Sequence, residues 1–561
     1  MSFTGGRYIL DIKEILIDAI CRAAQQSIVD GAFHAEKLPQ IILEVPPQKE
    51  FGDYATNFAL QAARAAKTNP RTIAEAIVQR LSESWLEKAE IAGPGFINFY
   101  LKSDIIYDRL AAIIEKGETY GDLAARNDGK IQVEYVSANP TGPLHVGHGR
   151  GAAMGSALVN LLRAAGYHVA SEYYINDAGN QIDNLAASVN ARYLELLGQT
   201  VDFPENGYHG HDIIDTAKRI INGHQDEYLA MSAEERLTIF KELALKEKLA
   251  ALKEDLAAFN VHFDQWFSER SLHQADAIHE TCEFLKGNGN IYEKDGALWL
   301  KSTAYGDDKD RVVIRDNGVP TYLAADIAYH RDKLERGFDT LINIWGADHH
   351  GYICRVRAAI EAMGYKGDAL EVLILQMVSL YRDGALVKMS KRTGQSVTLA
   401  ELIEEVGTDA ARFFFIMRSI DSQLDFDLDL AKSKSNENPV YYIQYAYARI
   451  CSIFRQAEEN GLGFTSQAKL NLLTTESEID LIKKMADYEE EIAFAAKDRA
   501  PHRIARYVHE LAGDFHSFYN QCRIMGAEKD LAEARLSLVK AVQNTIRHAL
   551  NILGVSAPEK M

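Results

Sequence analysis

The stretch IQVEYVSANPTGPLHVGHGRG (residues 131–151) constrains the fold of this chain more than any other. IQVEYV is an apolar run typical of a buried strand, and Pro140, Gly142 and Pro143 then enforce a bend. The segment GRGAAMGSALVNLLRAA predicts a helix that ends at Gly166, after which HVASEYYI resumes strand character. Strand, helix and strand in this order form a βαβ unit, so we expect a parallel sheet.

The rest of the chain indicates two further regions, one on each side of this α/β region. Strand-like runs at GALWL, RVVIR, TLINIW and EVLILQM extend the α/β pattern to about residue 425, with a charged helical insertion at about 180–290. Beyond it, apolar residues three and four apart predict bundle helices, whose aromatic residues we interpret as core rather than as base-stacking groups. We therefore expect an α/β protein: a small α/β domain at 1–115, a Rossmann-like parallel-sheet domain at 116–430 and an all-α helix bundle at 431–561.

Composition argues against several classes of function. The net charge of −19 disfavours a protein that simply coats nucleic acid, although residues 431–561 are balanced, with 17 basic and 17 acidic side chains. No segment approaches the ~20 apolar residues of a membrane helix, and the N-terminus lacks a signal-peptide pattern, so we expect a cytoplasmic protein with no membrane partner. The five cysteines lie far apart with no CxxC pair, so we expect no protein-held metal.

The HVGH bend is the first candidate site. In a parallel sheet, ligands bind at the carboxyl ends of strands, where helix N-termini attract phosphate charge. His145 and His148 can both face this crevice, and imidazoles can donate hydrogen bonds to phosphate oxygens as charge builds. Gly147 removes side-chain bulk between them, so a flat base could rest on the backbone. Alone, the motif fits a capped turn with two surface histidines equally well.

The second candidate is LVKMSKRTG, residues 386–394, which follows a strand-like run. Lys388, Lys391 and Arg392 gather on a Ser/Gly loop and could neutralise a leaving pyrophosphate. Phosphoryl chemistry needs positioning and charge stabilisation more than covalent help from the protein. Taken alone, this segment is most simply a solvated basic loop.

Together, the two motifs resemble the catalytic domain of class I aminoacyl-tRNA synthetases. By that resemblance the catalytic residues are His145, His148, Lys388 and Lys391, and Gly147, Met389 and Ser390 contact ATP. The intervening NIWGADHHGY (343–352) is similar to the ribose-binding strand end of the family, with Gly346 and Asp348 on the ATP ribose. The alternative is that this Gly-Ala-Asp only ends a strand and caps a helix.

The resemblance is closest to the arginyl-tRNA synthetase subgroup and covers essentially the whole chain. EVPPQKEFGDYATNFAL and IAGPGFINFYL resemble its N-terminal domain, which is associated with the tRNA elbow. NENPVYYIQYAYARICSI, LAGDFHSFYNQCRI and the ending NILGVSAPEKM resemble its helical anticodon-binding domain. The implied partners are therefore L-arginine and the acceptor end, elbow and anticodon of tRNA.

The chemistry of arginine recognition agrees with this subgroup. A planar guanidinium needs carboxylates that can hold it in a fork. Tyr322 and Asp326 lie one helical turn apart in TYLAADIAYH and can line one wall. The resemblance implies that Asp326, Tyr322 and Glu134 hold the guanidinium, whereas Asn139 holds the α-amino group. By spacing alone, Asp326 is more simply a carboxylate on a helix surface.

The resemblance implies that arginine attacks the α-phosphate of ATP, with Mg²⁺ assisting, and that a tRNA 3′ ribose hydroxyl then takes the arginyl group. Family members need bound tRNA before they activate arginine and are typically monomers, so we expect both here. Phosphate contacts are expected from local basic faces, with Arg449, Arg503 and Arg506 as candidates.

Three alternatives stay open at this point. Another class Ia synthetase, such as the cysteinyl enzyme, is favoured weakly by the intact KMSK motif but would bring a zinc site. A small nucleotidylyltransferase would share HxGH without needing the long helical C-terminal region. A tRNA-binding paralogue with a dead site would not need intact histidines and lysines in both motifs.

Overall fold

The computed structural model describes residues 12–46, 48–388 and 396–561. The chain forms two compact units, of which one contains the N-terminal part to Gly117 together with 457–486 and 517–541. The other contains 118–456, 487–516 and 542–561. Since neither unit is one continuous stretch, this division differs from the three domains expected along the sequence, whose boundaries stay a prediction.

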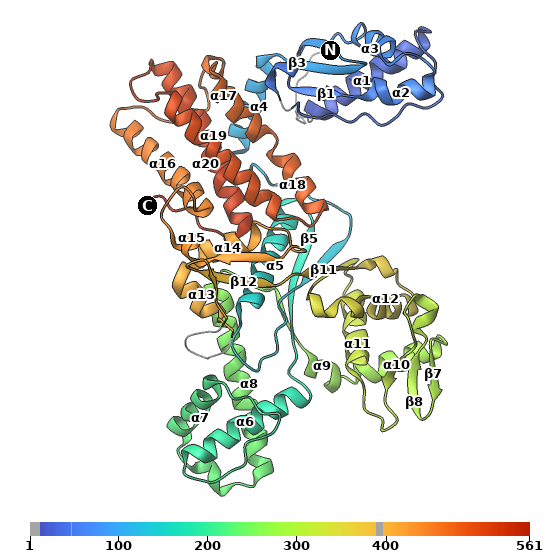
Figure 1. The fold of residues 1–561 in the computed structure, drawn as a ribbon, viewed down its shortest axis with the longest axis vertical. Helices are drawn as coiled ribbons and strands as arrows, with labels where there is room; N and C mark the ends of the chain where they lie inside the picture. The colour runs from blue at the N-terminus through green and yellow to red at the C-terminus, as the bar shows by residue number, and fades with distance from the viewer. Residues whose placement is uncertain (1–11, 47, 389–395) are drawn as a thin grey trace. The chain divides into compact units, whose positions relative to one another are not determined.

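The first unit begins with a small α/β fold (Figure 1, blue). Its antiparallel sheet has the order β1-β3-β2, and side chains alternate along β3, so that Ile97, Phe99 and Leu101 pack into the core. Helix α3 begins with Pro70 after Asn69, whose side chain accepts a hydrogen bond from the Arg71 N–H. The elements are α1 (Ile12–Val29), β1 (Tyr54–Thr56), α2 (Phe58–Ala66), α3 (Pro70–Val78), β2 (Leu86–Ala92), β3 (Phe96–Leu101), α4 (Ser103–Lys116) and, later in the chain, α17 (Glu476–Ala486).

The second unit is built on a five-stranded sheet in which all the strands are parallel, in the order β11-β10-β4-β5-β6. The chain enters at the central strand β4, continues outward through β5 and β6, and returns to the other side with β10 and β11. The switch point therefore lies between β4 and β10, and the expected Rossmann-like parallel sheet is confirmed. The strands are β4 (Lys130–Glu134), β5 (His168–Ile175), β6 (Gln265–Ser268), β10 (Thr340–Gly346) and β11 (Leu370–Leu375).

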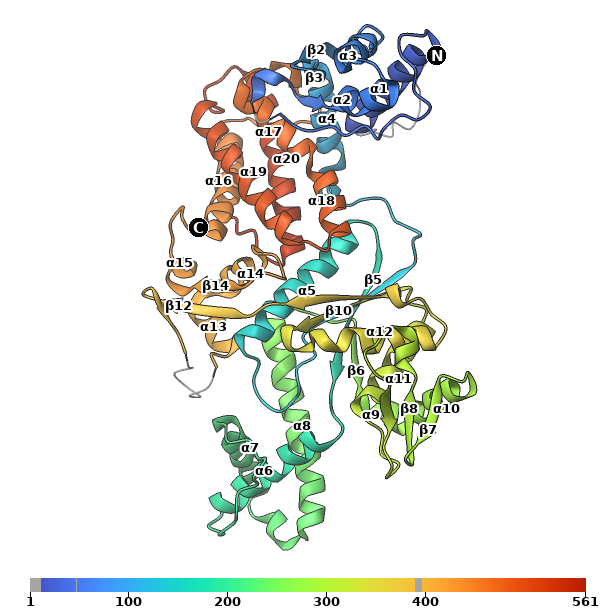
Figure 2. The same ribbon diagram turned by 45° about the vertical axis from the view of Figure 1, so that its right-hand side comes forward.

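Helices cover both faces of this sheet, with α5 (Val146–Ala164) on one and α11 (Tyr322–Glu335) and α12 (Ile353–Ala362) on the other (Figures 1 and 2). At the end of β4, successive side chains point to opposite faces of the sheet. The Tyr135 ring lies so close to Gly155 of α5 that a Cβ there would be 2.2 Å from its Cγ. The preceding residue, Glu134, instead bonds Lys333 of α11.

Several strand-like runs lie where the sequence pattern did not place them. GALWL and RVVIR form β8 (Ala297–Leu300) and β9 (Arg311–Ile314). With β7 (Ile291–Lys294) they make a separate antiparallel sheet in which β8 is the central strand. The run EVLILQMVSL is divided between β11 and β12 (Val378–Arg382), which belong to different sheets. The stretch 180–290, expected to be helical, also contains strand β6. This strand was not predicted because four residues are too few for a visible strand pattern.

The remaining elements of the second unit are mainly helical. In the insertion, Ser232 and Glu235 form a capping box at the start of α8, and apolar faces of its helices form a small core of their own. Its elements are α6 (Asn180–Leu196), α7 (His211–His224) and α8 (Ala233–Ala258), followed by α9 (Glu269–Gln274) and α10 (Ala277–Gly287). After β12 come β13 (Ala385–Leu386), α13 (Leu399–Val406), α14 (Thr408–Ile416), β14 (Leu424–Asp427), α15 (Leu428–Lys432) and α18 (Tyr488–Lys497).

The C-terminal region is helical, as expected. The remaining long helices are α16 (Pro439–Glu459), α19 (His502–Gln521) and α20 (Lys529–Leu553), each with residues in both units. On α16, Val440, Ile443, Tyr447 and Ile450 are buried, so their interpretation as core residues is confirmed. No described helix is both long and apolar enough to cross a lipid bilayer.

A single buried cation, Arg412 of α14, joins four segments of the second unit. Its guanidinium donates hydrogen bonds to the carbonyls of Leu553 and Phe259, at 2.9–3.0 Å, and to the Ser156 hydroxyl of α5. Burial lowers the pKa of Arg412 to about 10. Gly554 has φ +66°, and a Cβ there would be 2.4 Å from Nη2 of Arg412. Arg412 therefore helps to hold the end of α20 against α5, α14 and the chain after α8.

We expect Gly554→Ala to destabilise the second unit strongly. A left-handed backbone costs an alanine about 1–2 kcal/mol, and displacing Arg412 leaves buried carbonyls unpaired at about 1–3 kcal/mol more. Urea unfolding followed by circular dichroism measures the loss. The matched control is Gly289→Ala, at φ +76° with open space around it, which should show the backbone cost alone. Equal losses in the two variants would mean that Arg412 contributes nothing.

Candidate active site

A cavity of about 680 Å³ lies at the carboxyl ends of β4, β10 and β11, next to the switch point of the sheet. This is where parallel α/β sheets bind their ligands. We call it the switch-point cavity. It includes Asn139, His145, Gly147, His148, Gly346 and Asp348, six residues that the sequence singled out. Other lining residues include Ser137, Gly151, His349, Gln376, Met377 and Ser396.

The bend after β4 is strained and closely held. Val136 has φ +68° and Ser137 φ +41°, and such angles are unfavourable for side chains other than glycine, most of all for a β-branched one. The Ser137 hydroxyl donates to Glu134 at 3.0 Å and accepts from the Tyr174 N–H at 3.1 Å. The Tyr173 hydroxyl donates to the Ala138 carbonyl at 2.7 Å. Since β5 thus fixes the bend, Asn139 beyond it is placed on the cavity wall.

His145 and His148 form the N-terminal cap of α5. Nδ1 of His145 accepts the Gly147 N–H at 3.1 Å, and Nδ1 of His148 accepts the His145 N–H at 3.3 Å. The rings stack with centroids 3.7 Å apart. Burial lowers the pKa of His145, and burial together with the neighbouring ring lowers the pKa of His148 to about 3. Both imidazoles are therefore neutral, and because Nδ1 accepts, each carries its proton on Nε2.

Two glycines of the cavity make room for close side chains. A Cβ at Gly147 would be 3.0 Å from Cε1 of His145, so a side chain at this position would press on the stacked ring. A Cβ at Gly346 would be 2.6 Å from Oδ1 of Asp348. The Asp348 side chain is 81% exposed and lies 3.4 Å from Nε2 of His349, so its carboxylate is accessible to a ligand.

The segment after residue 395 forms another side of the cavity. The Val146 N–H donates to the Val397 carbonyl at 3.1 Å, and the Leu399 N–H donates to the Leu144 carbonyl at 2.7 Å. Ser396, which lines the cavity, directly follows the predicted lysine loop. Lys388, at the start of that loop, is exposed and is not a lining residue. Lys391, Met389, Ser390 and Arg392 lie outside the described residues.

Arg150 holds the neighbouring strand end in place. This fully buried side chain of α5 donates to the carbonyls of Gln376, Ser419 and Ser422 at 2.8–2.9 Å. Gln376 directly follows β11 and lines the cavity. Arg150 was not predicted as a site residue, although it stands two residues after His148 in the same motif.

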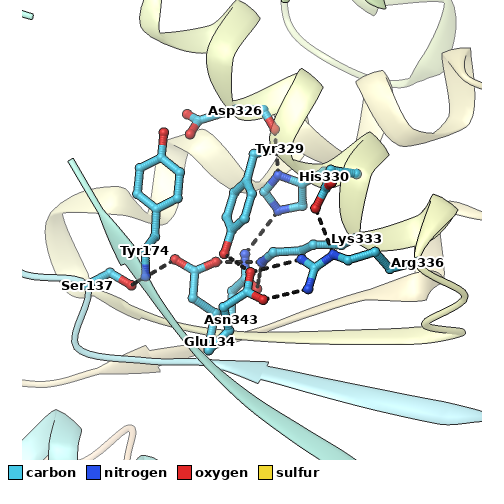
Figure 3. Close-up of polar contacts among 11 residues, drawn as sticks. Glu134, Ser137, Tyr174, Asp326, Tyr329, His330, Lys333, Arg336 and Asn343 are labelled. Atoms are coloured by element: carbon cyan, nitrogen blue, oxygen red, sulfur yellow. Dashed lines mark hydrogen bonds and ion pairs between the residues drawn. The ribbon is translucent and has the colours of Figure 1, made fainter. Parts of the chain in front are cut away.

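A buried acid cluster lies on the α11 side of the sheet (Figure 3). Glu134 forms an ion pair of 2.5 Å with Lys333, which is fully buried and also lies 3.3 Å from Oδ1 of Asn343. Because Ser137 donates to the same carboxylate, Glu134 connects this cluster to the switch-point cavity. The charge of Glu134 is already balanced by Lys333 before any ligand binds.

Asp326 differs from Glu134 because no described Lys or Arg side chain forms a hydrogen bond or ion pair with it, although Lys333 attracts its charge from further away. It accepts a 2.6 Å hydrogen bond from the Tyr352 hydroxyl. Burial, assisted by the negative charges of Glu134 and Glu269, raises the pKa of Asp326 to about 7. A cation that binds next to such a carboxyl group stabilises its ionised form. Tyr322, one turn earlier on α11, is 61% exposed.

Glu269 and Tyr174 were not among the site residues predicted from the sequence. Glu269 is buried, its pKa is raised by that burial, and the Tyr174 hydroxyl lies beside it. Figure 3 shows the Tyr174 side chain extending toward Asp326. The signal for Glu269 was its position directly after β6, at the same sheet edge as the other site residues, and that strand was not recognised.

Comparison with known proteins gives consistent matches along the chain. Three family models match: Arginyl tRNA synthetase N terminal domain at residues 11–101, tRNA synthetases class I (R), catalytic domain at 109–418, and DALR anticodon binding domain at 443–561. Arginine–tRNA ligase 1 of Halalkalibacterium halodurans is 54% identical over 94% of this chain and 95% of its own. Arginine–tRNA ligase of Desulforamulus reducens is 52% identical over 98% and 99%. The structure of Thermus thermophilus arginyl-tRNA synthetase superposes with a TM-score of 0.75 at 25% identity, over 98% of this chain and all of that one.

We expect nitrogen-15 NMR of the imidazoles to find His145 and His148 neutral at pH 7, with the proton on Nε2 of each. The capping bonds to Nδ1 and the lowered pKa of both rings require this. His148 should stay neutral well below the usual histidine pKa of about 6.5. Exposed His350 provides the comparison, and each signal is assigned by its loss on substitution. A proton on Nδ1 of either ring would contradict the capping geometry.

Proposed function

The chain belongs to the class I arginyl-tRNA synthetase family, and we propose how its residues divide the work of attaching arginine to tRNA with ATP. The ligation itself is an ATP-dependent reaction of translation. One observation supports our division most directly: the switch-point cavity is joined through Ser137 to an acid cluster in which Asp326 has no described cation partner. We assign ATP to the cavity and the arginine side chain to the cluster.

In the cavity, we assign the phosphates to the N-terminus of α5. A neutral imidazole with its proton on Nε2 donates a hydrogen bond without first binding a proton, so His145 and His148 suit an oxygen that gains charge. The α5 dipole adds positive potential at the same place. Gly147 leaves space for the base, and Gly346 and Asp348 are assigned to the ribose, in agreement with the accessible carboxylate of Asp348.

The lysine motif is assigned to the leaving pyrophosphate. Lys388 and Lys391, with Met389 and Ser390 against ATP, would contact the phosphates from the segment that precedes the cavity residue Ser396. The arginine carboxylate oxygen forms a bond to the α-phosphorus as the bond to the bridging oxygen breaks, and pyrophosphate leaves with that electron pair. A 3′-terminal ribose hydroxyl of tRNA then attacks the arginyl carbonyl and releases its proton. The bond from that carbon to the phosphate oxygen breaks, and AMP leaves with the electron pair.

Magnesium enters this scheme as part of the ATP substrate. The described residues contain no group of three or more His, Cys, Asp or Glu side chains arranged to hold a metal ion. Mg²⁺ retains several waters and binds through phosphates with few protein ligands, so the ATP phosphates would supply most of its coordination. Bound there, it would neutralise phosphate charge during the displacement.

We assign the guanidinium to Asp326, with Glu269 and the Tyr174 and Tyr352 hydroxyls around it. Asp326 gains most from a cation because no described Lys or Arg side chain lies within ion-pair distance of its carboxylate. Glu134 can contribute only by sharing its charge between Lys333 and the ligand, so its role is the smaller one. Asn139, on the cavity wall, is kept for the α-amino group, since its amide oxygen can accept from an ammonium.

We also assign Tyr322 as a contact of the guanidinium. Its exposed ring would move over the site when arginine binds. Its position at the first residue of α11 puts the ring one turn from Asp326. An arginine would bury part of this ring, because aromatic faces attract guanidinium groups.

For tRNA, we assign residues 1–115 to the elbow and 431–561 to the anticodon, with 116–430 holding the acceptor end. On α16, the Tyr441 and Tyr445 rings lie parallel with centroids 6.1 Å apart, and Arg449 lies over Tyr445. Unlike buried Tyr447, these two rings are half-buried, and stacked aromatic rings beside an arginine are a typical platform for unpaired bases. The other basic candidates, Arg503 and Arg506, are paired with Glu491 and Glu510, so their phosphate contacts would compete with these pairs. We propose a monomer that acts in the cytoplasm.

ATP–pyrophosphate exchange tests this assignment. We expect exchange with arginine, only when tRNA is present, and not with other amino acids. His145→Ala and His148→Ala should each lower the rate about 10²–10³-fold, because each removes one donor to the developing charge. His350→Ala, an exposed histidine outside the cavity lining, is the control and should leave the rate unchanged. Exchange that persists in both histidine variants would exclude the cavity as the ATP site.

We expect the KM for arginine to rise as the pH falls below about 7. The guanidinium needs the Asp326 anion, and the pKa of this group in the free enzyme is raised to about 7. Lowering the pH from about 8 to about 6 should therefore raise KM about tenfold by proton competition. The measurement uses the charging reaction at saturating ATP and tRNA.

Asp326→Asn should raise KM at every pH and remove most of this dependence. Glu335→Gln, on the same helix but at its exposed end, is the matched control. A pH dependence that survives in Asp326→Asn would assign the titrating group elsewhere.

A further inference from the structure

Lys333 of α11 is a fully buried cation that has no role in the division of work proposed above. Its ammonium group forms the 2.5 Å ion pair with Glu134 and lies 3.3 Å from Oδ1 of Asn343. It also lies over the Tyr329 ring, 4.2 Å from the centroid. These contacts occupy the three N–H donors of the group. Because Lys333 has no exposed surface and does not line the switch-point cavity, it acts on a ligand through its neighbours.

A chain of hydrogen bonds leads from Lys333 to the acid that we assign to the guanidinium (Figure 3). The Asn343 oxygen accepts from Lys333, and the Asn343 amide nitrogen lies 3.1 Å from Nε2 of His330. Nδ1 of His330 lies 2.8 Å from the backbone carbonyl of Asp326. Burial, together with the charge of Lys333, lowers the pKa of His330 to about 3, so this ring is neutral. It therefore accepts at Nε2 and donates at Nδ1, and all three bonds point from Lys333 toward Asp326.

The charge of Lys333 acts on both acids of the cluster. Burial raises the pKa of Asp326 most, and the negative charges of Glu134 and Glu269 raise it further. The hydrogen bond from Tyr352 and the positive charge of Lys333 act in the opposite direction. Two carboxylates in one buried site do not both ionise easily, because like charges repel, and a nearby cation reduces this cost. Lys333 supplies that cation to Glu134 by direct contact and to Asp326 from further away.

The other ionisable groups around the cluster do not replace Lys333. Arg336 bonds Glu172 at 2.7 and 3.0 Å, so its charge is already balanced. Burial raises the pKa of Glu269, and the nearby His273, at 3.6 Å, acts in the opposite direction on that acid. The tyrosines around the cluster are uncharged, because burial raises the pKa of Tyr174, Tyr329 and Tyr352.

We propose that Lys333 is a positioning residue of the arginine site, which keeps Glu134 and Asp326 ionised together so that one negative charge remains for the guanidinium. The proposal rests on the assignment of the arginine side chain to this cluster. With Lys333 present, Glu134 is balanced and Asp326 is left for the ligand. Without it, the two carboxylates would share a proton near neutral pH, and arginine would bind a less negative site or displace that proton. Lys333 thus limits the pH dependence of arginine binding to the titration of Asp326.

Lys333→Met tests this role, because it removes the charge and fills much of the same volume. The measured quantity is the KM for arginine in the charging reaction, divided by the wild-type KM at the same pH, which cancels the titration of arginine itself. We expect this ratio to fall at least about threefold as the pH rises from about 7 to about 9, because the extra proton then leaves the cluster. A ratio that stays constant over this range would mean that Lys333 only holds the fold, and would overturn the proposal.

Lys248→Met is the matched control. Lys248 is also buried and forms an ion pair of 2.6 Å, with Asp212, in the helical insertion. Its loss should lower the Tm, as the loss of Lys333 should, because each variant leaves a carboxylate without its counterion. The KM ratio of Lys248→Met should nevertheless stay constant with pH. A ratio that falls equally in both variants would make the effect one of stability, and would also overturn the proposal.

Glu134→Gln identifies the acid that holds the extra proton. Combined with Lys333→Met, it removes both partners of the pair, and the pH dependence of the ratio should disappear. Glu134→Gln alone leaves Lys333 free to pair with Asp326 in place of the guanidinium. We therefore expect the KM at about pH 8 to be at least about fivefold lower in the double variant than in Glu134→Gln. This comparison decides even where Lys333→Met alone does not fold, and equal KM values would overturn the proposal.

Asp326→Asn separates the role of Lys333 from the assignment of the arginine site. Where the cluster does not hold the guanidinium, neither Asp326→Asn nor Lys333→Met changes the pH dependence of KM. Where the cluster holds it but Lys333 is only structural, Asp326→Asn removes that dependence and Lys333→Met retains it unchanged. Both results overturn the role of Lys333, whereas only the first overturns the arginine site.

Discussion

Helix α5 is packed so tightly that the second unit depends on its small residues. It is buried along most of its length, and three of its glycines face neighbours that leave little or no room for a Cβ. A Cβ would be 2.8 Å from Leu399 at Gly149, 3.3 Å from Leu375 at Gly151 and 2.2 Å from Tyr135 at Gly155. The sheet, α13 and the bend after β4 can all approach one helix only because these positions have no side chain. The same helix presents its N-terminus to the switch-point cavity, so core packing and ligand geometry share one constraint.

Buried charge has a different form on the two sides of the sheet. On the α5 side, Arg150 and Arg412 are bonded mainly to backbone carbonyls, and the desolvation cost appears as a lowered pKa of each guanidinium. On the α11 side, Glu134 has Lys333 as a counterion, whereas the hydrogen bond to the Asp326 carboxylate among the described residues comes from the neutral Tyr352 hydroxyl. A positively charged substrate would form an ion pair with the Asp326 carboxylate. Because a buried carboxylate without an ion pair is costly, this site favours ligands that carry a positive charge.

Much of the catalytic frame could be predicted from local sequence, because a βαβ unit and a glycine-rich bend have strong local signals. HVASEYYI is β5, and the helix predicted over GRGAAMGSALVNLLRAA is α5, which begins three residues earlier, at Val146 within the HVGH motif. The sequence does not predict which sheet each strand joins. GALWL and RVVIR form an antiparallel sheet, but the same apolar pattern would also suit a parallel one. Strand β6 was too short to be predicted from the sequence. Glu269, which directly follows this strand, was therefore not predicted as a site residue. The Lys333 counterion of Glu134 also depends on tertiary contact, because the two are far apart in sequence.

The left-handed backbone at Val136 and Ser137 has a consequence for engineering this protein. A designer who seeks thermal stability would replace Val136 by glycine, which removes the local strain. The same change would widen the range of conformations open to the loop that carries Asn139, and the ligand would then have to restrict it on every binding event. Stability gained at this bend would thus be offset by weaker preorganisation of the wall, the usual conflict between robustness and activity. Selection for heat resistance should therefore favour changes far from this bend.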